Sequence, residues 1–111
     1  MEYWDLGTLD VRPHQPKILH SSRGESRTIA IVLPAGELLQ DHEVHERAHL
    51  VVVDGSVEVE GPDGGAVSGG PGFMAIWDPH ERHEVRAKTD SRLLLMLAPW
   101  PGDGHPGARD A

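Results

Sequence analysis

The chain of 111 residues contains no cysteine, which excludes disulfide scaffolds, thiolate zinc sites and cysteine nucleophiles. Aromatic residues make up only 5% of it, so a core must be built from Val, Leu, Ile and Ala. Basic residues are also scarce, 10 against 18 acidic ones, and the net charge is -8. A protein that follows nucleic-acid phosphates shows a Lys- or Arg-rich face, so we expect no nucleic-acid partner.

Long apolar runs are lacking as well. No run approaches the 18 or so residues that a membrane span needs, so we expect no membrane partner. The first residues, Met1 to Asp5, lack the basic and apolar regions of a signal peptide, which leads us to expect a cytoplasmic location. The length fits one small domain.

Glycine and proline, with 13 and 9 residues, recur between short β-rich segments. Turn signals at this spacing leave little room for helices and predict an all-β sandwich or barrel. The expected strands are residues 17–20, 28–33, 50–53, 57–60, 73–77, 83–87 and 92–97. The dipeptide Asp54-Gly55 predicts a hairpin between the third and fourth of these segments.

The segment from Leu93 to Leu97 is apolar at every position, which is too uniform for a half-exposed strand. We expect it to be covered on both faces, one of them by a second subunit. Tyr3, Trp4 and Trp100 lie near the ends of the chain, where large aromatic residues often cover a sheet or a subunit interface. These features together predict a homodimer.

Histidine is abundant, with eight residues in the chain. His42, His45 and His49 form one group and His80 and His83 a second, whereas His14, His20 and His105 are scattered. Imidazole is a common metal ligand near neutral pH, and two groups on separate strands can converge inside a barrel. For the scattered histidines we expect exposed or locally hydrogen-bonded positions.

The segment His45-Glu46-Arg47-Ala48-His49 matches H-E-x-x-H, the signature of zinc proteases. That motif works only on a helix, which sets both histidines on one face. The three successive valines from Val51 to Val53 and the following Asp-Gly favour a strand directly after it. A zinc protease is therefore a remote alternative.

A second pattern extends over half of the chain and resembles the two motifs of the cupin superfamily. The first motif, Gly-x5-His-x-His-x3,4-Glu-x6-Gly, is matched by Gly36, His42 and Gly55, and the second by the spacing of Gly72 and His83. The resemblance implies a small double-stranded β-helix, a jelly-roll barrel. It assigns residues 28–98 to the barrel, 1–27 to N-terminal strands and a loop that pack on it, and 99–111 to a C-terminal tail.

The chain departs from the first motif at two ligand positions, where Val44 stands for the second histidine and Ala48 for the glutamate. On a continuous strand, His42 shares a face with Glu46, whereas His45 and His49 lie on the opposite face. A turn or one-residue bulge between residues 42 and 45 would return His45 and His49 to the inner face.

The predicted metal ligands are therefore His42, His45 and His83, with His49 as the fourth. Glu46 is the reserve candidate for that fourth position. Glu46, Asp41 and His80 are the candidates for proton transfer, should they reach the cavity.

An imidazole-rich site suits a divalent transition metal such as Zn, Ni, Fe, Mn or Cu. Three protein ligands would leave positions open for a small organic molecule, which permits chemistry of the dioxygenase or isomerase type. The alternative is a non-catalytic barrel that binds a small ligand, or one whose site is vestigial. The sequence does not identify a substrate and does not decide whether the protein is an enzyme, because one fold can support many unrelated functions.

Overall fold

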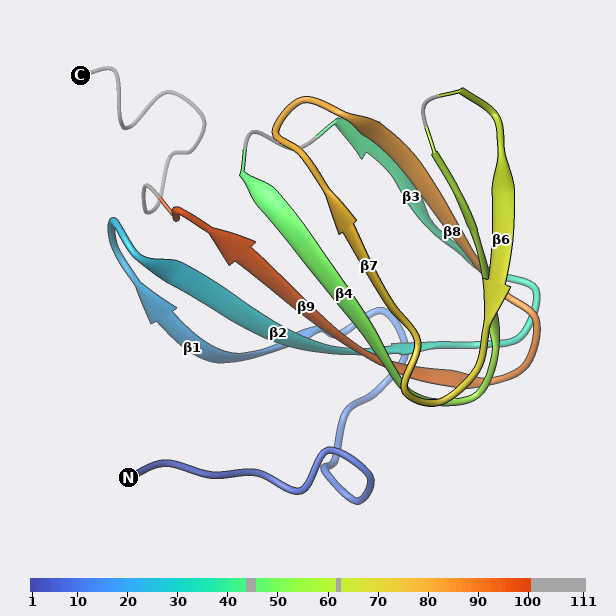
Figure 1. Ribbon diagram of the computed structural model, residues 1–111. Helices are drawn as coiled ribbons and strands as arrows, with labels where there is room; N and C mark the ends of the chain where they lie inside the picture. The colour runs from blue at the N-terminus through green and yellow to red at the C-terminus, as the bar shows by residue number, and fades with distance from the viewer. Residues whose placement is uncertain (44–45, 62, 101–111) are drawn as a thin grey trace.

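The protein is a two-layered β-structure in the computed structural model (Figure 1), which describes residues 1–43, 46–61 and 63–100, with the side chains of residues 40–43 excepted. The strands are β1 (Lys17–Ser22), β2 (Ser26–Leu33), β3 (Leu38–Glu43), β4 (Arg47–Asp54), β5 (Val57–Glu60), β6 (Ala66–Gly69), β7 (Met74–Trp77), β8 (Arg82–Ala87) and β9 (Ser91–Ala98). The chain forms no helix within these described ranges. The described residues therefore include no helix that could cross a membrane.

The strands form two sheets, in which all the pairs are antiparallel. One sheet has the order β1-β2-β9-β4-β7 and the other the order β3-β8-β5-β6. Figure 1 shows them as two layers, with β2 crossing from the first sheet into β3 of the second. The all-β prediction is confirmed.

Each of the seven predicted segments falls on a strand, but two strands escaped prediction. β6 (Ala66–Gly69) is short, contains a glycine and is mostly exposed, so it carries no alternating apolar signal. β3 (Leu38–Glu43) has apolar residues only at its start, and its polar second half lacks the apolar alternation that predicts a strand.

The hairpin predicted at Asp54-Gly55 is wrong. β4 belongs to the five-stranded sheet and β5 to the four-stranded one, so this turn carries the chain from one layer to the other. A turn signal marks a change of direction, but whether the next strand pairs with the previous one depends on which faces must be buried. The hairpin partner of β5 is instead the following strand, β6, and between them the Gly61 amide donates to the carbonyl of Gly65.

The core lies between the layers and follows the alternation of each strand. In β4, Ala48, Leu50 and Val52 are buried, while the residues between them are at least partly exposed. In β8 the same alternation buries His83 and Val85. Because burial of apolar area contributes about 25 cal/mol per Å², these aliphatic inner rows stabilise a barrel that has few aromatic residues.

Trp100 closes the core at the end of β9. Its side chain is only 9% exposed and belongs to the core cluster, and the Arg27 guanidinium lies over its ring at 4.0 Å. The Trp100 amide donates to the carbonyl of Glu25 in the β1–β2 turn. Trp100, which sequence analysis assigned to the C-terminal tail of residues 99–111, thus belongs to the packed core.

Candidate metal centre

The two motif histidines meet in one ladder. β3 pairs with β8, and in this pairing His42 is the direct cross-strand partner of His83. Residues opposite each other on antiparallel strands lie on the same face of the sheet, with Cβ atoms about 5 Å apart. The positions that carry the two halves of the pattern, 41 residues apart in the sequence, are therefore neighbours.

A bulge in β3 produces this pairing. Leu39 pairs with Val85, and the next pair, His42 with His83, has two intervening residues on β3 but one on β8. Leu39 packs against the core and Val85 is buried, so this row faces inward. Without the extra residue, position 42 would lie on the outer face, three residues from Leu39. Sequence analysis invoked such a bulge between residues 42 and 45, whereas the described register shift lies between Leu39 and His42.

His83 itself is buried, with 5% of its surface exposed. Its ring stacks on the indole of Trp77, with centroids 4.1 Å apart and planes inclined by 18°. Its Nδ1 lies 3.4 Å from the carbonyl oxygen of Glu81. A carbonyl acceptor at Nδ1 favours the tautomer that carries its proton there and leaves the Nε2 lone pair as a ligand.

The inner row of β4 approaches the same region. Ala48 stands where the motif has glutamate; it is fully buried and is the cross-strand partner of Trp77. Glu46, two residues earlier, is also buried, at 2% exposed. A buried carboxylate must be compensated by hydrogen bonds or a cation, since charge burial is otherwise costly. Glu46 thus combines the donor type that Ala48 lacks with the burial that an inner ligand needs.

His49 lies on the other face of β4. Its position alternates with the buried Ala48 and Leu50, and its cross-strand partners are Ile76 on β7 and Met96 on β9. The predicted ligand His45 is outside the described residues. Among the residues that are described, no three His, Asp or Glu side chains form a group that could hold a metal ion. The structure therefore brings together positions 42 and 83, and it separates His49 from them.

The H-E-x-x-H alternative fails in the part of the motif that the structure describes. Arg47, Ala48 and His49 are extended in β4 rather than helical. An extended segment cannot place residues four apart on one helical face with the glutamate between them. The zinc-protease reading is thus wrong because the sheet overrides a short motif match.

The remaining described histidines lie away from this ladder. His14 Nε2 is 2.7 Å from the Glu37 carboxylate, and His20 Nδ1 is 3.9 Å from that of Glu2. These two histidines are exposed, as expected, and each lies near the carboxylate of a residue that is distant in the sequence. His80, a candidate for proton transfer, is exposed in the turn before β8 and has a positive φ of 68°.

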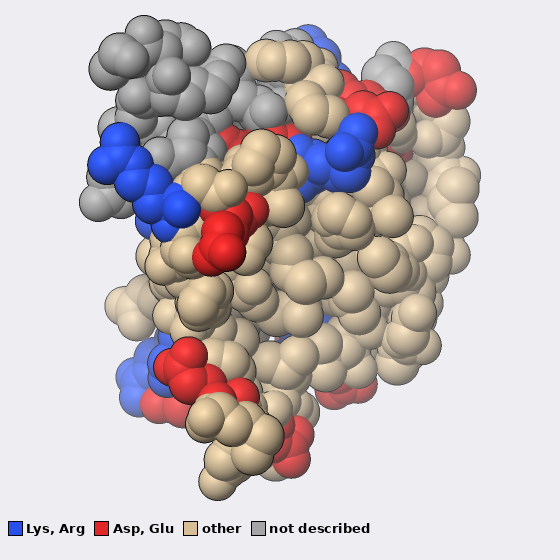
Figure 2. Space-filling view, turned by 60° about the vertical axis from the view of Figure 1, so that its left-hand side comes forward, with Lys and Arg blue, Asp and Glu red and all other residues tan. Residues whose placement is uncertain are grey.

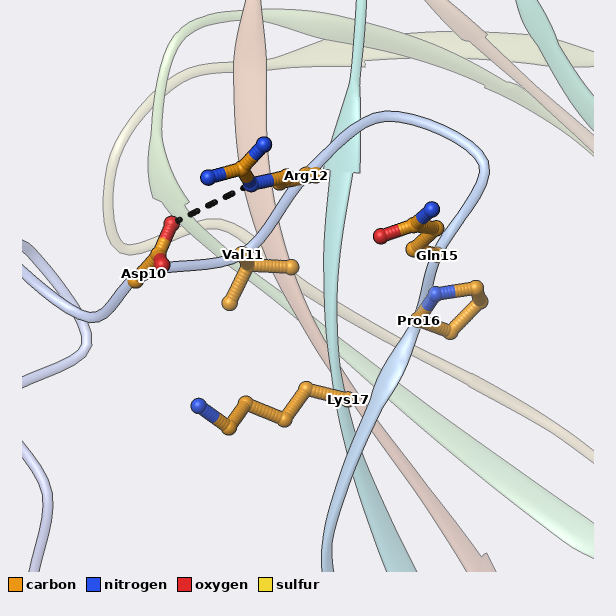
Figure 3. A pocket seen from close by; sticks show the side chains of 6 residues that line it. All are labelled: Asp10, Val11, Arg12, Gln15, Pro16 and Lys17. Atoms are coloured by element: carbon orange, nitrogen blue, oxygen red, sulfur yellow. Dashed lines mark ion pairs between the residues drawn. The ribbon is translucent and has the colours of Figure 1, made fainter.

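A separate cavity of about 280 Å³ lies in the N-terminal segment and is lined by Asp10, Val11, Arg12, Gln15, Pro16 and Lys17 (Figure 3). Arg12 and Asp10 form an exposed ion pair across it at 3.9 Å. Exposed pairs of this kind are worth little energy. No barrel histidine lines this cavity, so it is distinct from the candidate metal centre.

Two antiparallel sheets with inward-facing motif positions define the class: the chain has the cupin fold, the double-stranded β-helix. Solved cupin structures match it over most of its length. An RmlC-like cupin protein from Desulfovibrio desulfuricans is 24% identical, with a TM-score of 0.77 over 89% of this chain and 97% of that one.

An uncharacterized conserved protein with a double-stranded β-helix domain from Klebsiella pneumoniae is 15% identical, with a TM-score of 0.75 and coverage of 89% and 90%. The cupin domain of Schizosaccharomyces pombe Cnp3 is 13% identical, with a TM-score of 0.75 over 85% of this chain and 66% of that one. No family model matches the sequence, and no curated protein matches it. At these identities the likeness establishes the fold.

Proposed function

We propose that this protein is a small metal-binding cupin that holds one divalent transition metal on the inner face of β3 and β8. The single observation that carries the proposal is the cross-strand pairing of His42 with His83. Two imidazoles on adjacent strands are a common nucleus of a first-row metal site.

Glu46 is the fourth ligand in this proposal, in place of His49 and beside His42, His45 and His83. Its burial at 2% and its position before the inner row of β4 support it, whereas His49 alternates to the outer face. His45 stays a proposed ligand from the sequence. Three histidines and one carboxylate form a donor set that suits Fe, Mn or Ni and leaves positions open on a six-coordinate metal.

The chemistry proposed for this site is the binding of a small chelating organic molecule at those open positions. A bound metal of this kind supplies Lewis-acid polarisation or, if it is redox-active, activation of dioxygen. Trp77 covers one face of the His83 ring and fixes its plane, and the Glu81 carbonyl orients its Nδ1 edge. The chain thus contributes a buried imidazole whose orientation is fixed by its neighbours.

A metal-free barrel that binds a small organic ligand is the second candidate. The observation that favours it is Ala48 with Trp77 as its cross-strand partner, where the cupin motif has a carboxylate. The indole of Trp77 adds apolar surface to this region, and alanine in place of glutamate at position 48 removes a negative charge. Metal content separates the two candidates, and oxygen uptake with candidate substrates then tests for turnover.

The first test is the metal content of protein purified without chelator. We expect up to one first-row transition metal per chain, measured by elemental analysis, with uptake of Zn, Ni, Fe or Mn after stripping. A protein that contains none and takes up none contradicts the metal-binding proposal and leaves the metal-free barrel.

The role of Glu46 is tested by the substitution Glu46→Gln. Loss of an anionic ligand is expected to weaken metal binding by more than about 10-fold, measured by competition with a chromophoric chelator. Glu58→Gln is the matched control, because Glu58 is an exposed carboxylate on β5. Equal affinities of both variants would remove Glu46 from the ligand set.

A further inference from the structure

The cavity of about 280 Å³ in the N-terminal segment brings two cations and one carboxylate to one place. Arg12 and Lys17 line it together with Asp10, so the local charge is positive in a chain whose net charge is -8. Val11 and Pro16 add an apolar wall. In the view of Figure 3, the side chains of Arg12 and Lys17 extend on either side of Val11. The cavity thus combines cationic groups with a small apolar surface.

The two cations of this cavity are weakly neutralised. Figure 2 shows one face of the molecule, where basic side chains lie near acidic ones at the margins of a broad uncharged area. In the cavity, by contrast, Arg12 Nε is 3.9 Å from Asp10 Oδ1, a distance too long for a hydrogen bond. Among the described residues, no carboxylate lies within 4.0 Å of Lys17 Nζ. Both cations therefore keep hydrogen-bond donors for an added anion.

A tight turn gives the cavity its shape. Arg12 and Gln15 are bridge partners, and the Gln15 amide donates to the Arg12 carbonyl at 3.2 Å. Pro13 and His14 lie between them, and His14 has a φ of 63°. Proline followed by a residue of positive φ is typical of a type II turn, in which glycine is favoured at the second position. A histidine in this conformation is strained, and it persists only where its surroundings hold it there.

Three contacts hold this segment in place. His14 Nε2 lies 2.7 Å from Glu37 Oε1, directly before β3. Before the cavity, Arg92 Nη1 donates to the carbonyl of Leu9 at 2.7 Å. After it, Lys17 begins β1, which pairs with β2. The backbone around the cavity is thus ordered without a ligand, so that a ligand would bind with little further loss of conformational entropy.

We propose that this cavity binds a short aliphatic monocarboxylate, with its carboxylate between Arg12 and Lys17 and its carbon chain against Val11 and Pro16. A carboxylate matches the paired donors of a guanidinium, and one negative charge balances the excess of one cation. A phosphate monoester carries a charge of about -1.5 to -2 and would exceed that excess. A cavity of this volume is at the small end of ligand sites, which favours a small molecule. The inference is independent of the metal.

Titration of the ¹⁵N-labelled full-length protein with sodium butyrate tests the inference. At constant ionic strength, we expect saturable shifts of the backbone amides of Gln15 and Lys17. A Kd of about 1 mM is the order expected for a ligand this small. Butyramide has the same shape without the charge and is expected to bind about 10-fold more weakly. Inorganic phosphate at neutral pH is expected to bind more weakly than butyrate.

Lys17→Gln and Arg12→Gln test the two cations separately. Each is expected to weaken butyrate binding by about 5-fold, because each removes one partner of the carboxylate. Lys88→Gln is the matched control, because Lys88 is an exposed lysine after β8 whose Nζ donates to Ser68 Oγ at 3.4 Å. Its affinity for butyrate is expected to equal that of the wild type.

Four results would each overturn the inference. Shifts that do not saturate, or that miss both amides, would show that butyrate does not occupy the cavity. Equal affinity for butyramide would show that the charge is not recognised. Phosphate binding as tight as that of butyrate would contradict the monocarboxylate class. An equal loss of affinity in Lys88→Gln would show that butyrate responds to the charge of the whole protein and not to this site.

Discussion

His83→Ala is expected to lower metal affinity by more than about 100-fold while the fold survives. The substitution removes a ligand at the centre of the proposed site, an effect larger than the 10- to 100-fold typical of outer-sphere partners. Truncation of the imidazole leaves a cavity next to Trp77, which lowers the free energy of unfolding by about 2 kcal/mol. A loss of this size leaves the protein folded at 25 °C. Chelator competition measures the affinity, and circular dichroism measures the folded fraction.

His49→Ala is the matched control for this experiment. It removes the same side chain from the outer face of β4, where its neighbours are Ile76 and Met96. We expect unchanged metal affinity. A loss equal to that of His83→Ala would restore the ligand set in which His49 is the fourth member. Full retention of metal by His83→Ala would instead refute the pairing of the two motifs at one site.

Gly55→Ala is expected to destabilise the protein by more than about 2 kcal/mol. Gly55 has a φ of 89°, and an added Cβ would lie 2.4 Å from both the Asp90 carbonyl oxygen and Ser91 Oγ. Ser91 is buried and its hydroxyl donates to the carbonyl of Thr89 at 2.8 Å, so the neighbouring turn cannot move away freely. Thermal unfolding should show a melting temperature about 10 °C lower.

Gly72→Ala separates backbone strain from the close approach. Gly72 has a φ of 90°, but no atom lies within 4 Å of its added Cβ. The expected cost is the left-handed strain alone, about 1 kcal/mol. If both variants lost the same stability, the contact with the turn at Asp90 would not be the cause of the requirement for glycine.

The turns and aliphatic segments predicted the fold well because both signals are local. The alternation of Val57 and Val59 with glutamates, for example, marks β5 by itself. The partners of β5 do not follow from such patterns: it pairs with β6 and β8, not with the preceding β4. Local chemistry specifies that a strand forms, and long-range burial chooses the sheet.

The candidate site was predictable in part for the same reason. The spacing from Gly36 to His42 and from Gly72 to His83 indicated the two motifs, and the ladder of β3 and β8 pairs their histidines. The choice of the fourth ligand depended on which face of its strand each candidate occupies. A single extra residue in a strand exchanges the two faces for every residue after it. The sequence does not mark the bulge after Leu39, which sets the face of position 42, and it does not fix the register of β4, which sets the face of His49.

The sequence by itself determined the all-β class, the glycine-marked turns, the absence of thiol chemistry and the identity of the metal-ligand candidates. The tertiary structure alone decided which face of its strand each of the described candidates His49 and His83 occupies. It buries His83 against Trp77 and turns His49 to the outer face of β4. The reason is that side-chain type is carried by each residue, whereas the face of a strand is set by register, which the whole sheet fixes at once.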